Sequence, residues 1–318
     1  MEELQELRRY HDALPGAGSE SIGAARSRLA GHMRGSRRPR ARRIRPVWGL
    51  SLAMALAAGL IGVQVVGIGG QAPVRAEAAE ILEHAALVAE RDAAGAPRPG
   101  QFVYIESTTA YGSSSSAAAK DWMIAPKLRR TWRSVDGTHN GLLRERPESN
   151  PDGWTESTLP GCVNGKFTSG AQSRNSCQTQ PGYLGNLPTD PKRMYDYLYR
   201  NSQGGNPAGE QAFITIGDLI RENAVPPKAL AAMFRAAAKI PGTTVVGDVV
   251  DPAGRKGVAV AYTTGGTRRE LIFDSKTYEY FGEREVAVKD LSYVKKGDLI
   301  GGTARRTVAI VDEPGQLP

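Results

Sequence analysis

The chain has 318 residues, of which 40% are hydrophobic and 23% charged, and 41 Lys and Arg against 33 Asp and Glu give it a net charge of +8. This composition can build a folded core, and the negative mean hydropathy of −0.37 excludes a protein with many membrane spans. Two cysteines exclude a disulfide-dense scaffold and a zinc site made mainly of thiolates.

Most of the positive charge lies in residues 1–46, which contain eleven arginines, no lysine and five acids, a net charge of +6. Nine of these arginines fall between Arg26 and Arg45 without an intervening acid. A basic segment can bind nucleic acid, but no aromatic residues lie between these arginines to stack on bases. We therefore expect no nucleic-acid partner.

An uncharged stretch follows, from Val47 to Val74. At the rise of an α-helix it is long enough to cross a hydrocarbon core of roughly 30 Å. Trp48 stands where an aromatic anchor is expected at the membrane interface. We interpret residues 47–68 as one transmembrane helix and assign the membrane segment to residues 47–70.

A cleaved signal peptide is the alternative for this stretch. Val74-Arg75-Ala76 loosely resembles a small-x-small cleavage site, and Ser36-Arg37-Arg38 begins like a twin-arginine signal. However, the basic region before the stretch is long and the apolar run exceeds the roughly 7–15 residues of a signal peptide. The sequence favours an uncleaved anchor and leaves cleavage open.

The charges on either side of the span predict its orientation. Arginines crowd the N-terminal side, so the positive-inside rule places residues 1–46 in the cytoplasm and residues 71–318 outside the cell membrane. Within the cytoplasmic segment two short amphipathic patterns predict helices that are too short to be stable alone. We expect this segment to be a solvated tail or to fold on a protein partner.

Residues 76–92 predict an alanine-rich helix at the membrane exit. Alternating apolar positions predict strands over residues 101–111 and 128–146, the second region forming a hairpin about Asp136-Gly137. Residues 148–187 are rich in Gly, Ser, Asn, Thr, Gln and Pro, which predicts a long loop.

This predicted loop contains both cysteines, Cys162 and Cys177. In an oxidising exterior we expect them to form a disulfide that staples the loop, and we regard two free thiols as the less favoured alternative. No histidine lies near them in sequence, so we expect no metal site.

Apolar positions at helical spacing, with prolines at the start, predict three further helices near residues 191–199, 211–223 and 226–240. Residues 243–288 then predict an antiparallel meander whose strands are Thr244–Val250, Gly257–Thr263, Arg269–Asp274, Tyr278–Phe281 and Glu285–Val288, and Thr303–Val311 predicts a last strand. The order of elements predicts one extracytoplasmic α+β domain with an antiparallel sheet, which could be curved like a half-barrel, and packed helices.

The chain lacks the GxSxG, HExxH, GxxxxGK[ST] and strand-borne GxGxxG motifs. One SxxK pattern occurs at Ser292–Lys295, but its SDN and KTG partners are absent, so we interpret it as turn sequence. His84 and His139 are expected at the surface, and Asp248, Asp251 and Asp274 are expected to form turns. We assign no catalytic, cofactor-binding or metal-binding residues and expect no cofactor.

Several motifs resemble those of an actinobacterial family of single-pass membrane proteins of unknown function. They are ELQELRRYHDALP, SIGAARSRLAGHM, GQFVYIES, LPTDPKRMYDYL, DLIRENAVPPKALAAMFRAAAKIPG, DPAGRKGVAVAY and RRELIFDSKT, and the resemblance covers nearly the whole chain. Members are often encoded beside extracytoplasmic-function sigma factors, which implies an anti-sigma-like or sigma-linked regulatory role. The cytoplasmic segment lacks the His-Cys-Cys pattern of zinc-type anti-sigma domains.

We therefore expect a membrane-anchored, non-enzymatic envelope protein that acts as a regulator or sensor, with a cytoplasmic partner such as a sigma factor. An envelope carrier that binds a lipid, a lipoprotein or another apolar ligand is the alternative. An extracellular hydrolase that uses Ser292 and Lys295 has the least support.

Overall fold

The computed structural model describes residues 71–318 except 93–94, 115–121, 170–175, 202–203 and 293. They belong to one compact unit, Val66–Pro318, and the predicted α+β class with an antiparallel sheet is confirmed. The predicted cytoplasmic segment 1–46 and membrane segment 47–70 lie outside the described residues. Among the helices that are described, none has the length and apolar character needed to cross a membrane.

The helices and strands follow the predicted order. The described helices are α3 (Gln71–Glu90), α4 (Pro191–Arg200), α5 (Ala208–Arg221) and α6 (Pro227–Ala237). The strands are β1 (Phe102–Ser114), β2 (Trp122–Ile124), β3 (Lys127–Ser134), β4 (Gly141–Pro147), β5 (Thr155–Leu159), β6 (Cys162–Val163), β7 (Lys166–Phe167), β8 (Thr243–Val250), β9 (Lys256–Thr264), β10 (Thr267–Phe273), β11 (Tyr280–Ala287) and β12 (Leu299–Val311).

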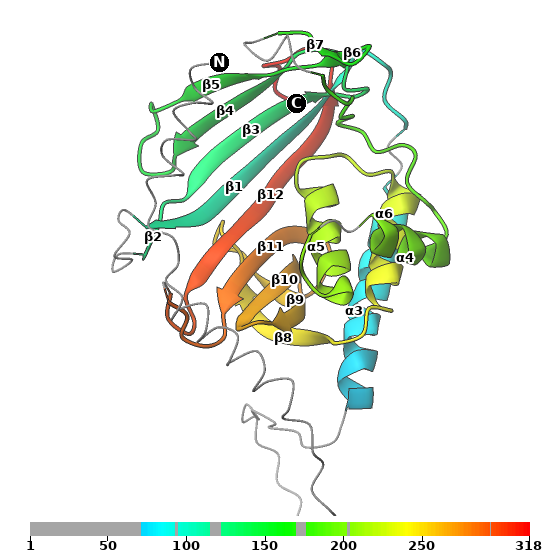
Figure 1. The fold of residues 1–318 in the computed structure, drawn as a ribbon, viewed down its shortest axis with the longest axis vertical. Helices are drawn as coiled ribbons and strands as arrows, with labels where there is room; N and C mark the ends of the chain where they lie inside the picture. Colours follow the sequence, from blue (N-terminus) through cyan, green and yellow to red (C-terminus); the bar gives the residue numbers. More distant parts are fainter. Residues whose placement is uncertain (1–70, 93–94, 115–121, 170–175, 202–203, 293) are drawn as a thin grey trace, which may run out of the picture. The chain divides into compact units, whose positions relative to one another are not determined.

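The last strand joins the two halves of the chain into one sheet. Its order is β5-β4-β3-β1-β12-β11-β10-β9-β8, with β2 paired to β1, and β6 and β7 form a separate small ribbon. Because β12 pairs with β1 on one side and β11 on the other, the N-terminal strands and the C-terminal meander form a single domain (Figure 1).

All four described helices gather beside the C-terminal strands, and their apolar sides form the main core with β8–β10 (Figure 1). Alternate strand residues Val260, Leu271 and Phe273 face this core, because successive side chains of a strand point to opposite faces. The helices contribute fully buried residues such as Leu82, Met194, Leu198, Phe213, Ile216, Ile220, Met233 and Phe234. The predicted apolar sides of these helices are therefore core.

The helix α3, which follows the predicted span, is tied to α6 by an ion-pair clamp. Arg235 on α6 reaches Glu83 at 2.8 Å and Glu90 at 2.5 Å, both on α3. The hydrogen bond from Arg235 lowers the pKa of Glu90, although slight burial acts in the opposite direction. The clamp therefore holds the C-terminal half of α3 against the core.

The structure corrects two details of the prediction. The predicted loop 148–187 contains β5, an edge strand that pairs with β4, as well as the β6–β7 ribbon. Nearly every residue of β5 is exposed, so it lacks the apolar alternation by which strands are recognised. The predicted separate strands Tyr278–Phe281 and Glu285–Val288 are one strand, β11.

Gly282 allows β11 to continue through this irregular point. Its φ of +151° lies in a region that side chains disfavour, and a Cβ there would overlap the carbonyl oxygen of Thr303 on β12. The β10–β11 register shifts at the same place, between Ile272 and Phe273. Such a bulge bends a strand and raises its twist. Gly282, which falls in the gap between the two predicted strands, therefore lies at a bend within one continuous strand.

Candidate functional site

The predicted disulfide between Cys162 and Cys177 is present, with the two Cα atoms 6.0 Å apart. The Cys162 N–H donates to the carbonyl oxygen of Gly137 at 2.9 Å, and the Thr179 hydroxyl donates to the Cys162 carbonyl at 3.3 Å. The backbone hydrogen bond therefore joins the β6–β7 ribbon to the turn between β3 and β4, and the disulfide joins the ribbon to the segment that contains Cys177.

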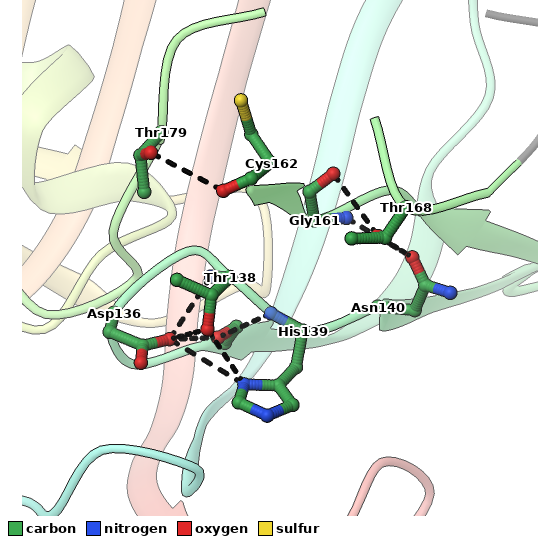
Figure 2. A network of polar contacts seen from close by, with 9 residues as sticks. Asp136, Thr138, His139, Asn140, Gly161, Cys162, Thr168 and Thr179 are labelled. Carbon is green, nitrogen blue, oxygen red and sulfur yellow. Dashed lines mark hydrogen bonds and ion pairs between the residues drawn. The ribbon is translucent and has the colours of Figure 1, made fainter. Parts of the chain in front are cut away.

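A network of polar side chains organises that turn (Figure 2). The Asp136 carboxylate accepts hydrogen bonds from the hydroxyls of Ser134 and Thr138, both at 2.7 Å, and from the Thr138 N–H at 3.0 Å. Partial burial acts to raise the pKa of Asp136, but these hydrogen bonds outweigh it and lower the pKa to about 2. The arrangement is that of an Asx turn.

His139 lies in the same network, which brings a Ser, a His and an Asp together. However, the Ser134 hydroxyl donates to Asp136 and accepts from the His139 backbone N–H, while the His139 ring contacts the Thr138 hydroxyl at 2.9 Å. In a nucleophilic triad the serine hydroxyl would instead be hydrogen-bonded to the imidazole ring. These contacts therefore stabilise the turn and do not activate Ser134.

The other residues singled out in the sequence are dispersed. Ser292 is exposed in the turn between β11 and β12, and Lys295 pairs with Asp290 at 3.5 Å on the surface. Asp251 and Asp274 accept backbone N–H groups within tight turns, which confirms their predicted role. Within the described ranges, no group of three or more His, Cys, Asp or Glu side chains is placed to hold a metal ion.

A cleft of about 820 Å³ lies in the described part of the chain. Its lining comes from the C-terminal half of α3, the turn from β10 to β11, residues 305–308 of β12, and Leu230 and Phe234 of α6. Residues 305–311 of β12 pair with β1 alone, because β11 pairs with β12 only up to Ala304. The cleft therefore occupies the space where β11 and β12 separate.

Part of the cleft lining is apolar and partly exposed. Leu87 on α3 is 40% exposed and Val308 on β12 is 39% exposed, and both line the cleft with Val88 and Phe234. His84 stacks on Tyr278 at the rim, with ring centroids 4.6 Å apart. His84, expected at the surface, is thus part of the cleft wall, and an alkyl or aromatic ligand would cover this apolar surface.

The lining is also basic. It includes five Arg and Lys residues and two acids, Asp92 and Glu279; the basic residues are Arg91, Arg255, Lys276, Arg305 and Arg306. The guanidinium of Arg306 pairs with Glu148, which is not part of the lining. Arg255 is fixed by hydrogen bonds from its guanidinium to Asp251 at 2.7 Å and to the carbonyl oxygens of Phe281 and Arg305, both at 2.9 Å. The Asp251 carboxylate thus balances the charge of Arg255 and holds its guanidinium in place.

Arg305 is partly buried, and its guanidinium carbon lies 5.2 Å from the centre of the Tyr280 ring. Burial lowers the pKa of Arg305, partly offset by Tyr280 and Asp92, and burial also raises the pKa of Tyr280. Because Tyr280 stays neutral, it supports the cation through its ring face. An anionic group in the cleft would further stabilise the charge on Arg305.

Sequence reasoning missed this cleft because its walls come from segments far apart in the chain. Two signals were present. The pair Arg305-Arg306 interrupts an otherwise uncharged stretch of the predicted last strand, and Tyr278, Tyr280 and Phe281 cluster after a turn. Neither signal indicates a site until the sheet order brings the segments together.

The comparisons with known proteins add little. The chain matches no protein-family model and no curated protein. It is similar to a solved structure titled "The complex structure of Pseudomonas aeruginosa MucA/MucB", at 13% identity and a TM-score of 0.28, over 76% of this chain and 58% of that chain. The chain thus spans just over half the length of that protein, and a similarity of this degree supports no conclusion about function.

Proposed function

We propose that residues 71–318 are a non-enzymatic binding domain of the cell envelope and that its cleft binds an amphiphile with an anionic head. The observation that carries this proposal is a lining that combines partly exposed apolar side chains, Leu87 and Val308, with basic side chains that include Arg305. Each methylene of a ligand that covers the apolar side chains contributes about 0.8 kcal/mol. The basic side chains select the sign of the head group.

Decanoate and decyltrimethylammonium test this proposal, because they share an alkyl chain and differ in charge. We expect calorimetry on residues 71–318 to show that decanoate binds more tightly than the cation. Arg305→Met should weaken decanoate binding about tenfold, since one charged hydrogen bond contributes about 1.5 kcal/mol. Arg98→Met is the matched control, because Arg98 lies outside the cleft and pairs with Asp312 on the surface.

Equal binding of the two probes would contradict an anion-selective cleft, and binding of neither would contradict the proposal as a whole. An unchanged affinity in Arg305→Met would place the head group elsewhere. Because methionine keeps an apolar chain beside Tyr280, this variant is expected to fold, which circular dichroism checks.

We propose further that the chain belongs to the actinobacterial family that its motifs resemble and that residues 47–70 anchor it in the cell membrane as a single span. Residues 1–46 would then lie in the cytoplasm and contact a sigma factor or a similar partner. The charge distribution and the disulfide support this orientation, because disulfides persist outside the reducing cytosol. Detergent co-purification of the full chain with and without residues 1–46 tests it, and a partner retained after the deletion refutes the cytoplasmic contact.

A further inference from the structure

A second cavity, of about 310 Å³, is lined largely by side chains other than those of the amphiphile cleft. Its lining comes from β1, β3, β4 and β12 and from the C-terminal end of α5. Ser107, Thr109 and Tyr111 are alternate residues of β1 and therefore share one face, and Thr303 lies directly opposite Thr109 on β12. Four side-chain hydroxyls thus converge on one space.

Tyr111 provides an aromatic surface at this cavity. Its hydroxyl lies 3.1 Å from that of Thr303, and 51% of the residue is exposed. The ring packs closely against Gly301, where a Cβ would approach the ring atom Cδ1 to 2.5 Å. The glycine and the hydrogen bond therefore fix the ring and leave one part of it open, which is unusual for a tyrosine that only fills a core.

Arg129 provides fixed donors in the same cavity. Its terminal nitrogens bind Glu145 at 2.9 Å and Glu222 at 2.8 Å, and its Nε is buried with no partner among the described residues. The two carboxylates hold the guanidinium in place and balance its charge.

The lining also includes the exposed Lys127 and the paired Arg221. Arg221, at the end of α5, donates from its Nε to Glu283 at 2.5 Å and pairs with Asp218 at 3.0 Å. Burial raises the pKa of Glu283, with Arg221 acting in the opposite direction. Arg221 and Tyr111 also line an adjoining cavity of about 80 Å³, where the buried Nε of Arg269 likewise lacks a partner among the described residues.

We propose that this cavity binds a neutral saccharide unit, with Tyr111 as the stacking surface. A sugar hydroxyl both donates and accepts, so it can pair with a carboxylate oxygen and a guanidinium N–H at once. The C–H face of a pyranose ring matches the electron-rich face of tyrosine. An anion would meet the Glu145 and Glu222 carboxylates, and an apolar ligand would leave the hydroxyls of Ser107 and Thr109 without a partner from the ligand.

Saturation-transfer NMR on the full chain tests this proposal with maltose, cellobiose and N,N′-diacetylchitobiose as probes. The protein is held in a zwitterionic detergent, because maltoside detergents would compete with the probes. At least one disaccharide is expected to bind at millimolar concentration. Tyr111→Ala should reduce its affinity about tenfold through loss of stacking, whereas Tyr111→Phe should stay within about threefold of the native chain.

Two controls separate this site from the cleft and from misfolding. Arg305→Met alters the cleft only, so it should leave saccharide binding unchanged, and Tyr111→Ala should leave decanoate binding unchanged. The proposal is overturned if no disaccharide binds, if Tyr111→Ala binds as well as the native chain, or if inorganic sulfate displaces the sugar. None of these outcomes bears on the decanoate result, so the two proposals fail independently.

Discussion

Gly217 lies in the interior of α5, where replacing glycine by alanine normally stabilises a helix by about 1 kcal/mol. In this protein a Cβ at Gly217 would overlap the Oε2 atom of Glu283. The carboxylate would have to move away from its hydrogen bond with Arg221, and loss of a charged hydrogen bond costs about 1.5–3 kcal/mol. Gly217→Ala should therefore destabilise the domain by about 1–2 kcal/mol, a fall in Tm of roughly 2–8 °C.

Thermal and urea unfolding of Gly217→Ala, with and without Glu283→Ala, measures this effect. Once the carboxylate is removed, the new methyl group meets no obstacle, and alanine should stabilise the helix by up to about 1 kcal/mol. The expected result is thus a change of sign between the two backgrounds. Stabilisation in the native background, or an equal cost in both, would refute the steric argument.

Two further predictions concern the disulfide and the β3–β4 turn, to which Cys162 is hydrogen-bonded. The double variant Cys162→Ser, Cys177→Ser should lose about 3 kcal/mol in urea unfolding, because the bond closes a loop with a sequence separation of 15; an unchanged midpoint would contradict this. Folding lowers the pKa of Asp136 to about 2. The stabilisation that its carboxylate gives the folded state is therefore complete above the unfolded-state pKa of about 3.9, and it is lost as the pH falls to about 2. Asp136→Asn should therefore cost up to about 2 kcal/mol at pH 7 and little at pH 2, and a cost independent of pH would count against the ionised carboxylate.

Much of the fold was predictable because its signals are local. Asp190 caps α4 by accepting from the N–H of Arg193 at 2.8 Å, and Pro191 follows it in the first turn, as the sequence indicates. The β3–β4 hairpin turns at the predicted Asp136-Gly137 pair, and Gly137 has the positive φ that such a turn requires. Each of these features depends on residues only a few positions apart.

The candidate sites were not predictable in this way. The amphiphile cleft and the saccharide cavity both depend on the pairing of β12 with β11 and with β1, and the second pairing joins segments about 200 residues apart. Only in that register does Arg305 lie over the Tyr280 ring. The same register brings the Tyr111 hydroxyl to Thr303. No periodicity within a single segment specifies which distant strand it will join.

The sequence by itself determined the arginine-rich segment, the uncharged stretch after it, the order of helices and strands, and the cysteine pair, because each is a matter of composition or short-range spacing. Only the tertiary structure decided that β5 extends the sheet, that β11 is continuous through Gly282, and that β11 and β12 separate to leave a cleft. The physical reason is that strands pair through backbone N–H and C=O groups, which do not depend on the side chain. Which strand pairs with which therefore depends on how the whole chain packs.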